Sequence, residues 1–426
     1  MYLMKKDNLN IRGKLGIVDV LLMFLFVFNV AFVFVPELFR SRVIIGLFGV
    51  VVFFRESKSI VPIELPRLFF WIIIGLFLSI CTIVVNSTME VRFIGNSFQN
   101  ILYLFGAYLL VRRLEFDFGL VLKSVVLSVF IHNILALVMF LNTGLLDFIW
   151  SFQHTGGNFE FAFGNAIEFG TRFIGVGIGS FFSGGMISCA GILLCSYLIT
   201  VVKGKRFIWV FILLFLYITG IFLARIVYVG IALSLVYLVW AYFKTGKLTH
   251  LPRIIFVSVL IFIFGSIYVY SNIDTLMNIS SFNHAFELVI NFFTTGELST
   301  KSTDVVRSML IFPTELKSLI IGDGKFYDSD GSFYMSTDVG YSRLVYYFGV
   351  LGALSYFFIH IYISYLILKS NRRNKILTAL VYLLFALLFI GNIKGLVDFN
   401  WLMFLFFWVV VKNKSSLFDE TIPSYK

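Results

Sequence analysis

Continuous apolar runs occupy most of this chain and restrict what it can fold into. Twelve runs approach or exceed the roughly 20 residues that a helix needs to cross a bilayer core. Their apolar residues are contiguous rather than alternating, which predicts helices and excludes barrel strands. Only 13% of the residues are charged, whereas soluble domains carry about 25%. We therefore expect an all-α polytopic membrane protein with about 12 transmembrane helices. The expected spans are residues 17–36, 40–55, 67–85, 93–111, 120–141, 173–202, 207–224, 226–243, 253–271, 339–368, 376–392 and 395–412.

The basic residues orient these spans. With the N-terminus in the cytoplasm, 23 of the 34 Lys and Arg residues fall in inner segments and 11 in outer ones, as the positive-inside tendency requires. An even number of spans then returns the C-terminus to the cytoplasm. The net charge of +11 follows from this topology and from contact with anionic lipid, so it does not imply a nucleic-acid partner.

Two of the expected outer loops are long, residues 142–172 and 272–338, and the whole chain, 1–426, reads as a single integral membrane domain. A long ordered loop in a compact protein usually has a function. In the second loop, apolar residues recur at helical spacing, which predicts short amphipathic helices on the outer membrane surface. These residues are Phe282, Phe286, Leu288, Val289, Phe292, Phe293, Val305, Val306, Met309 and Leu310.

Four arginines lie on the expected outer side, where the positive-inside tendency does not explain them. Arg172 opens the sixth span, and Arg225 lies in a tight turn with no acidic residue nearby in the sequence. Arg307 lies in the large loop, and Arg343 lies about 7.5 Å further along its helix than Asp338. Guanidinium groups around one cavity would bind phosphate oxygens in pairs, which suggests an anionic amphiphile as substrate. The alternative is a set of scattered surface charges, with Asp338 at a helix N-terminus.

Two further polar features have simpler interpretations. His132 and Asn133 lie inside the fifth span, where a buried polar pair that bridges helices is the first interpretation and a proton relay the second. Asp328 and Asp330 imitate the D-x-D motif of metal-dependent glycosyltransferases, but those enzymes use a cytoplasmic donor and this loop is expected outside. We therefore expect no metal site here.

Two short patterns in the outer loops resemble the O-antigen ligase and polysaccharide polymerase superfamily, often called Wzy-type polymerases. The first is an Arg followed by an apolar stretch, a Pro and a G-x-G element, here Arg307, Pro313, Gly322 and Gly324. The second is an acid or His, then a Tyr and an apolar helix with G-x-x-G, here Asp338, Tyr341, Gly349 and Gly352. Two further segments, ARIVYVG and TRFIGVGIGSFFSGG, resemble Arg-bearing segments of that family, so the similarity in organisation extends over most of the chain.

The resemblance implies a metal-independent glycosyltransferase without a cofactor, in the bacterial cytoplasmic membrane. Its donor and acceptor would both be oligosaccharide repeat units linked to undecaprenyl pyrophosphate. It would join them outside the membrane, for capsule, exopolysaccharide or O-antigen synthesis, with membrane lipid and a chain-length regulator as further partners.

The resemblance also suggests roles for individual residues. Arg172, Arg225, Arg307 and Arg343 would hold the charge of the pyrophosphate leaving group. Asp338 would take the proton of the acceptor hydroxyl, and Tyr341, three residues further along the same helix face, would orient acceptor or phosphate. A helix N-terminus and a nearby Arg favour the carboxylate form and so weaken Asp338 as a base. The alternative bases are Asp304, Glu168, Glu160 and His154.

Other functions remain open at this stage. Ligase relatives commonly have His-Asn where this chain has Asp338 and Val339, which favours a polymerase over an O-antigen-ligase-like transferase. A flippase for the same lipid-linked units would also have about a dozen spans, but transporters often show similar halves, and no repeat is visible. A cell-wall polymerase of the shape-and-division type is a third alternative.

Overall fold

A computed structural model describes most of the chain. The described residues are 15–56, 62–154, 170, 172–202, 204, 206–245, 260, 264, 267–268, 271–272, 279–297, 300–329 and 331–421. The expected ninth span, 253–271, lies almost entirely outside this set, as do Glu160, Glu168 and Asp330.

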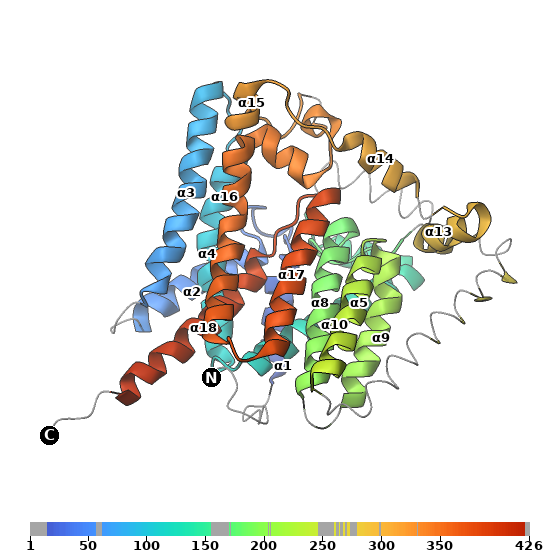
Figure 1. The fold of residues 1–426 in the computed structure, drawn as a ribbon, viewed down its shortest axis with the longest axis horizontal. Coiled ribbons are helices and arrows are strands. Elements are labelled where there is room, and N and C mark those ends of the chain that lie inside the picture. The colour runs from blue at the N-terminus through green and yellow to red at the C-terminus, as the bar shows by residue number, and fades with distance from the viewer. Residues whose placement is uncertain are drawn as a thin grey trace.

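Within these residues the chain is all-helical, apart from two isolated β-bridges (Figure 1). Each expected span other than 253–271 contains one helix, and the expected loops contain α6, α13, α14, α15 and the 3-10 turn η1. The elements are α1 (Ile17–Phe28), α2 (Ser41–Glu56), α3 (Glu64–Asn86), α4 (Arg92–Arg113), α5 (Phe118–Leu141), α6 (Thr143–Trp150), α8 (Phe181–Val201), α9 (Arg206–Leu223), α10 (Val227–Thr245), α13 (Ser280–Thr295), α14 (Lys301–Met309), α15 (Leu316–Ile320), η1 (Tyr334–Ser336), α16 (Gly340–Ser370), α17 (Lys375–Lys394) and α18 (Asn400–Thr421).

Seven of the described helices are long and apolar enough to cross a membrane: α3, α5, α8, α9, α10, α16 and α17. The helix α1 and the apolar part of α18, Asn400–Asn413, are shorter. The architecture is therefore that of a polytopic membrane protein, while the described residues do not reach the expected count of twelve spans.

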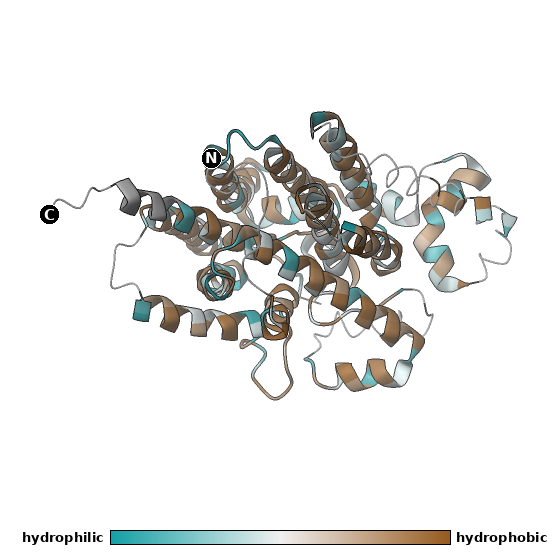
Figure 2. Cartoon of the chain, turned by 90° about the horizontal axis from the view of Figure 1, so that it is seen from below, coloured by the Kyte–Doolittle hydropathy of each residue, from teal (hydrophilic) through white to brown (hydrophobic). Residues whose placement is uncertain are grey.

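Hydrophobic residues make up most of the helices, as the colouring in Figure 2 shows, and many of them are exposed on the outside of the bundle. On α3, for example, Phe70, Ile73, Phe77 and Val84 are 57%, 55%, 63% and 70% exposed. A soluble monomer rarely exposes so much contiguous apolar surface. Contact with lipid tails is the environment that suits this surface.

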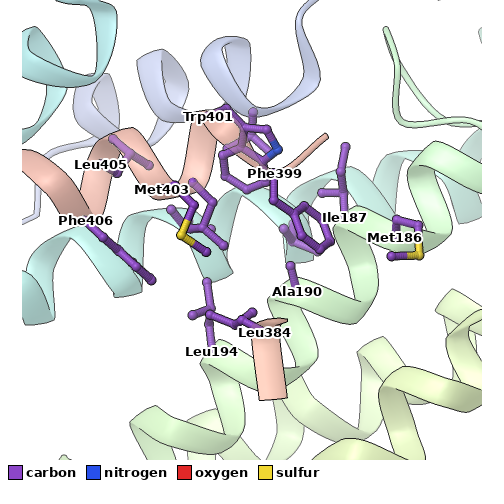
Figure 3. Packing of buried hydrophobic residues seen from close by; sticks show 14 of the residues in the cluster. Met186, Ile187, Ala190, Leu194, Leu384, Phe399, Trp401, Met403, Leu405 and Phe406 are labelled. Carbon is purple, nitrogen blue, oxygen red and sulfur yellow. The ribbon is translucent and has the colours of Figure 1, made fainter. Parts of the chain in front are cut away.

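The helix α8 forms the centre of the bundle and packs against α5, α9, α10 and α17. Its small residues allow close approach: a Cβ on Gly191 would lie 2.8 Å from Val129, and a Cβ on Gly185 would lie 2.7 Å from Ala224. Small residues play this part in many membrane helix contacts. Figure 3 shows side chains of α8 in one apolar cluster with side chains of α17, Phe399 and α18. The labelled residues are Met186, Ile187, Ala190, Leu194, Leu384, Phe399, Trp401, Met403, Leu405 and Phe406.

Two expected spans are shorter as helices than the apolar pattern predicts. The first ends at Phe28 instead of residue 36, because Asn29 adopts a left-handed conformation (φ 46°) at the C-cap. The sixth begins as a helix at Phe181 instead of residue 173, within the sequence GSFFSGG. Hydropathy does not register these breaks, since the non-helical residues are as apolar as the helical ones.

The non-helical segments beside these breaks satisfy each other's backbone groups. Ile178 N donates to Phe28 O at 2.8 Å, and Val176 N donates to His132 Nε2 at 3.1 Å. Irregular backbone within a membrane bundle needs such partners, because lipid offers none. Asn133 bridges α5 to α9, accepting a bond from Thr219 Oγ1 at 3.0 Å. These bonds match the interpretation of His132 and Asn133 as a buried polar pair that bridges segments.

Candidate functional site

One end of the bundle carries α13, α14 and α15, and we call it the loop face (Figure 1). There α3, α5, α9 and α17 end, and α4, α8, α10 and α16 begin. All of the described candidate site residues lie at this end, on the helix termini or on the segments that connect them.

The pair Asp338–Arg343 forms at the start of α16. Arg343 Nη1 donates to Asp338 Oδ1 at 3.1 Å. The Arg343 side chain is 8% exposed, whereas that of Asp338 is 53% exposed. The N-cap residue of α16 is Val339, which provides no side-chain cap. The carboxylate therefore faces outward from the bundle, while the guanidinium lies inside it.

Aromatic rings hold the Arg343 guanidinium. Its central carbon lies 3.7 Å from the centroid of the Phe333 ring and 4.2 Å from that of Phe326. Arg92 lies 4.4 Å from the same Phe326 ring and also donates to the hydroxyl of Tyr327. Each such contact contributes about 0.5–2 kcal/mol. The Nε of Arg343 is nevertheless buried without a hydrogen-bond partner, so this buried cation has unused donor capacity.

The two sequence patterns that carry the family resemblance meet in space. Gly322, φ +82°, and Gly349, φ +68°, lie on opposite sides of one close contact. A Cβ on Gly349 would lie 2.1 Å from Ile320 O. Asp323 N and Gly324 N donate to carbonyls at the kink of α16, at 2.6 and 3.1 Å. This contact fixes the loop after α15 against α16, six residues from Arg343.

A second group of cations lies around α13. Arg225, between α9 and α10, forms an ion pair with Glu287 of α13, and the two side chains are 14% and 17% exposed. Tyr228 OH donates to Ala285 O at 3.0 Å, which docks α13 onto the start of α10. The acidic partner that Arg225 lacks nearby in the sequence therefore comes from the large loop.

His284 shows which charges share this region. Burial and the positive charges of Arg172, Arg225 and Lys394 lower the pKa of His284 to about 3. Burial also lowers the pKa of Arg172, and burial together with Arg172 lowers that of Arg225. Arg172, Arg225 and Lys394 therefore all lie within electrostatic range of His284 on α13.

Lys394 joins this group to the Asp338–Arg343 pair. Burial raises the pKa of the Asp338 carboxyl, and Arg343 and Lys394 both act to lower it. The ammonium of Lys394 also donates to Ser302 Oγ of α14 at 3.2 Å. The loop-face cluster, as we name it from here, consists of Arg172, Arg225, His284, Glu287, Asp338, Arg343 and Lys394.

Arg307 and Tyr341 lie differently from these residues. Arg307 is exposed on α14 and forms no ion pair within the described part of the chain. Its helix is nevertheless fixed near the cluster, because Thr337 Oγ1 donates to Met309 O at 2.6 Å. Tyr341 OH donates to Phe389 O of α17 at 3.0 Å, so its hydroxyl is used within the bundle rather than presented to the cluster.

The described alternative bases are also apart from the cluster. Asp304 is exposed on α14. His154 Nε2 lies 2.9 Å from Val35 O, in the non-helical segment after α1. Across the described ranges no group of three or more His, Cys, Asp or Glu side chains has the arrangement of a metal site.

The sequence alone does not mark Lys394, His284 and Glu287 as members of the cluster. Lys394 lies in a short expected outer turn, so it departs from the charge bias in the same way as Arg225. His284 and Glu287 are three residues apart on one face of α13, but only the docking of α13 brings that face to Arg225.

Comparison with known proteins adds no assignment: no family model, no curated protein and no solved structure matches this chain.

Proposed function

We propose that the chain is a glycosyltransferase that polymerises oligosaccharide repeat units linked to undecaprenyl pyrophosphate, on the outer face of the bacterial cytoplasmic membrane. The observation that supports this most is the loop-face cluster. It gathers Arg172, Arg225 and Lys394 next to the Asp338–Arg343 pair at one end of an apolar bundle. Four cations and two acids leave an excess of positive charge, which suits a diphosphate attached to a membrane lipid.

The cations would act on the leaving group. As the bond between sugar and pyrophosphate breaks, negative charge grows on the phosphate oxygens, and preorganised donors in a partly buried site stabilise it. Guanidinium groups can bind two oxygens at once. Because the pKa of His284 is lowered to about 3, its imidazole is neutral near pH 7 and can donate one hydrogen bond without adding charge.

Asp338 is the proposed base. Its carboxylate is 53% exposed at the loop face and can reach an acceptor hydroxyl. Arg343 lowers the pKa of Asp338, but partial desolvation of the carboxyl by the surrounding protein has the larger, opposite effect. A carboxylate with a raised pKa is the better proton acceptor.

The proposed topology places the loop face outside and both termini in the cytoplasm. Arg55, Arg112 and Arg113 lie at the far ends of α2 and α4, and Arg372 and Arg373 lie between α16 and α17. We call this opposite end, which is defined by these five residues, the basic end. Its positive charge suits the cytoplasmic side of the membrane.

The test is reconstitution. The purified chain in lipid nanodiscs receives only lipid-linked oligosaccharide extracted from the cells to which the chain is native, and product length is measured. A polymerase lengthens the oligosaccharide on its lipid, whereas a flippase would move it across a vesicle membrane at constant length. If the folded protein does not lengthen the oligosaccharide but transports the lipid-linked oligosaccharide across a vesicle membrane, the chain is a flippase and not a polymerase.

Asp338→Asn tests the base within the same assay. We expect at least a roughly hundredfold slower lengthening, the usual contribution of general base catalysis. The control is Asp19→Asn, which removes a carboxylate paired with Arg113 at the basic end. Normal product length and rate in Asp338→Asn, at normal protein levels, would exclude Asp338 as the base.

A further inference from the structure

A stripe of polar side chains runs along α4 from the loop face into the bundle. Arg92, Asn96, Gln99, Asn100 and Tyr103 occupy positions i, i+4, i+7, i+8 and i+11, which share one helix face over about 16 Å. Polar residues inside a membrane bundle are costly and are retained where they have a function. α4 packs most closely against α2 and α18, so the stripe has partners there.

The inner end of the stripe contacts α2 and the segment after α1. Tyr103 OH donates to Gln99 Oε1 at 3.0 Å, and the guanidinium of Arg42 lies 4.8 Å from the Tyr103 ring centroid. Arg42 is 3% exposed. It donates to Phe26 O at 2.6 Å and Val27 O at 2.7 Å, the last carbonyls of α1, where a cation is favourable.

The segment between α17 and α18 completes this group. Asn400 Nδ2 donates to Asn100 Oδ1 at 3.2 Å, and Asn400 N donates to Asp398 Oδ1 at 2.7 Å. The Oδ1 of Asn400 is buried without a hydrogen-bond partner, in a residue that is 3% exposed. Asp398 itself is exposed, although Val397 and Phe399 on either side of it are only 3% and 1% exposed.

Charge distinguishes this group from the loop-face cluster. Asp398 interacts electrostatically with the guanidinium of Arg42, so one acid and one cation balance. Tyr356 of α16 interacts electrostatically with both Asp398 and Arg343, and its hydroxyl donates to Val397 O at 2.7 Å. Tyr356 therefore lies within electrostatic range of both groups.

We propose that Arg42, Asn100, Asp398 and Asn400 form a subsite for the uncharged, hydroxyl-bearing sugar rings of the substrate. This inference rests on the proposed function and adds where the oligosaccharide binds. Amide and carboxylate groups side by side offer donors and acceptors to neighbouring hydroxyls. The buried guanidinium of Arg42 balances the carboxylate charge, which suits a neutral ligand. The exposed carboxylate of Asp398 and the unpaired oxygen of Asn400 would accept hydrogen bonds from sugar hydroxyls.

Two lipid probes separate the subsite from the cationic cluster. Binding of sugar-free undecaprenyl pyrophosphate and of the extracted lipid-linked oligosaccharide is measured on the same protein in nanodiscs. We expect Asp398→Asn and Asn100→Ala to bind the sugar-free lipid as the wild type does. Both should bind the oligosaccharide form at least about tenfold more weakly, as the loss of a charge-assisted or buried hydrogen bond predicts.

Controls keep the test decisive. Asp19→Asn and Asn371→Ala remove a paired carboxylate and a buried amide far from the subsite and should bind both lipids normally. If Asp398→Asn folds poorly, Asn100→Ala alone decides. Equal loss for both lipids, or no loss for either, overturns the subsite. Wild-type protein that binds neither lipid instead overturns the proposed function, so the two failures are distinguishable.

Discussion

The ion-paired arginines of the loop-face cluster are more buried than those of the basic end. At the basic end, Arg113 is 42% exposed and pairs with Asp19, and Arg112 is 43% exposed and pairs with Glu56. Exposed pairs of this kind contribute about 0–1 kcal/mol. At the loop face, Arg343 is 8% exposed and Arg225 is 14% exposed.

Burial of a cation is costly unless the structure compensates it. The loop face compensates Arg343 with one carboxylate and two aromatic rings, yet leaves its Nε without a partner. A structural role alone would be served by the exposed arrangement of the basic end. Under the proposed function, the buried cations at the loop face bind the pyrophosphate of the substrate.

The largest contrast between the ends should come from exchanging Arg for Lys. Arg343→Lys keeps the charge but loses the planar group that stacks on Phe333 and binds two oxygens. We expect lengthening to slow by about 10²–10³-fold, the usual effect of one electrostatic donor. Arg113→Lys at the basic end should leave the rate unchanged. Comparable rates for the two variants would contradict the functional difference between the arginines of the loop face and those of the basic end.

The next largest effect tests the contact that positions the loop face. Gly349→Ala places a Cβ 2.1 Å from Ile320 O, at a residue with φ +68°. We expect a loss of roughly 1–3 kcal/mol in stability, with slower lengthening, measured by thermal unfolding and the polymerisation assay. Gly75→Ala on α3, whose Cβ would meet nothing within 4 Å, is the control. An unchanged unfolding midpoint for Gly349→Ala would contradict the close contact.

A double-mutant cycle compares the ion pairs of the two ends directly. Arg225→Gln, Glu287→Gln and the double variant should show a coupling energy of about 1–3 kcal/mol in unfolding, because removal of one partner leaves a partly buried charge. The cycle for Arg112 and Glu56 should give about 0–1 kcal/mol. Equal coupling in the two cycles would show that the loop-face pair is an ordinary surface pair.

The smallest effect concerns pH. The pKa of His284 is about 3 in the folded chain, below its usual 6.5, because of burial and three neighbouring cations. Below pH 6.5 the unfolded chain therefore binds a proton that the folded chain does not, and stability falls as pH decreases. His284→Gln should lose less of its unfolding temperature between pH 7.5 and pH 5 than the wild type does. An equal loss would show that the pKa of His284 is not lowered in the folded chain.

Local sequence predicted the elements of the large loop well. Apolar residues at helical spacing indicated helices, and α13 and α14 contain Phe282, Phe286, Val289, Val305 and Val306 as expected. The same kind of pattern predicted the ends of two spans wrongly, at residues 36 and 173. The helix of the first span ends before Asn29, and the helix of the sixth span begins only at Phe181. Hydropathy does not depend on backbone conformation, so the apolar pattern could not show these limits.

The candidate site was only partly accessible from the sequence. An Arg in an outer turn is visible as a departure from the charge bias, and this found Arg172, Arg225 and Arg343. The charge bias could not show that Arg343 is buried between aromatic rings whereas Arg307 is exposed on α14. Burial depends on which segments pack together, and the rings come from the loop 326–333.

By itself the sequence determined an all-helical chain with membrane-length apolar helices, because continuous apolar runs leave the backbone no other way to satisfy its hydrogen bonds in lipid. The tertiary structure alone decided which charges meet. Glu287 reaches Arg225 across 62 positions of the chain, and Asn400 reaches Asn100 across 300. Electrostatic interactions depend on distance in space, and for residues so far apart in the chain only packing sets that distance.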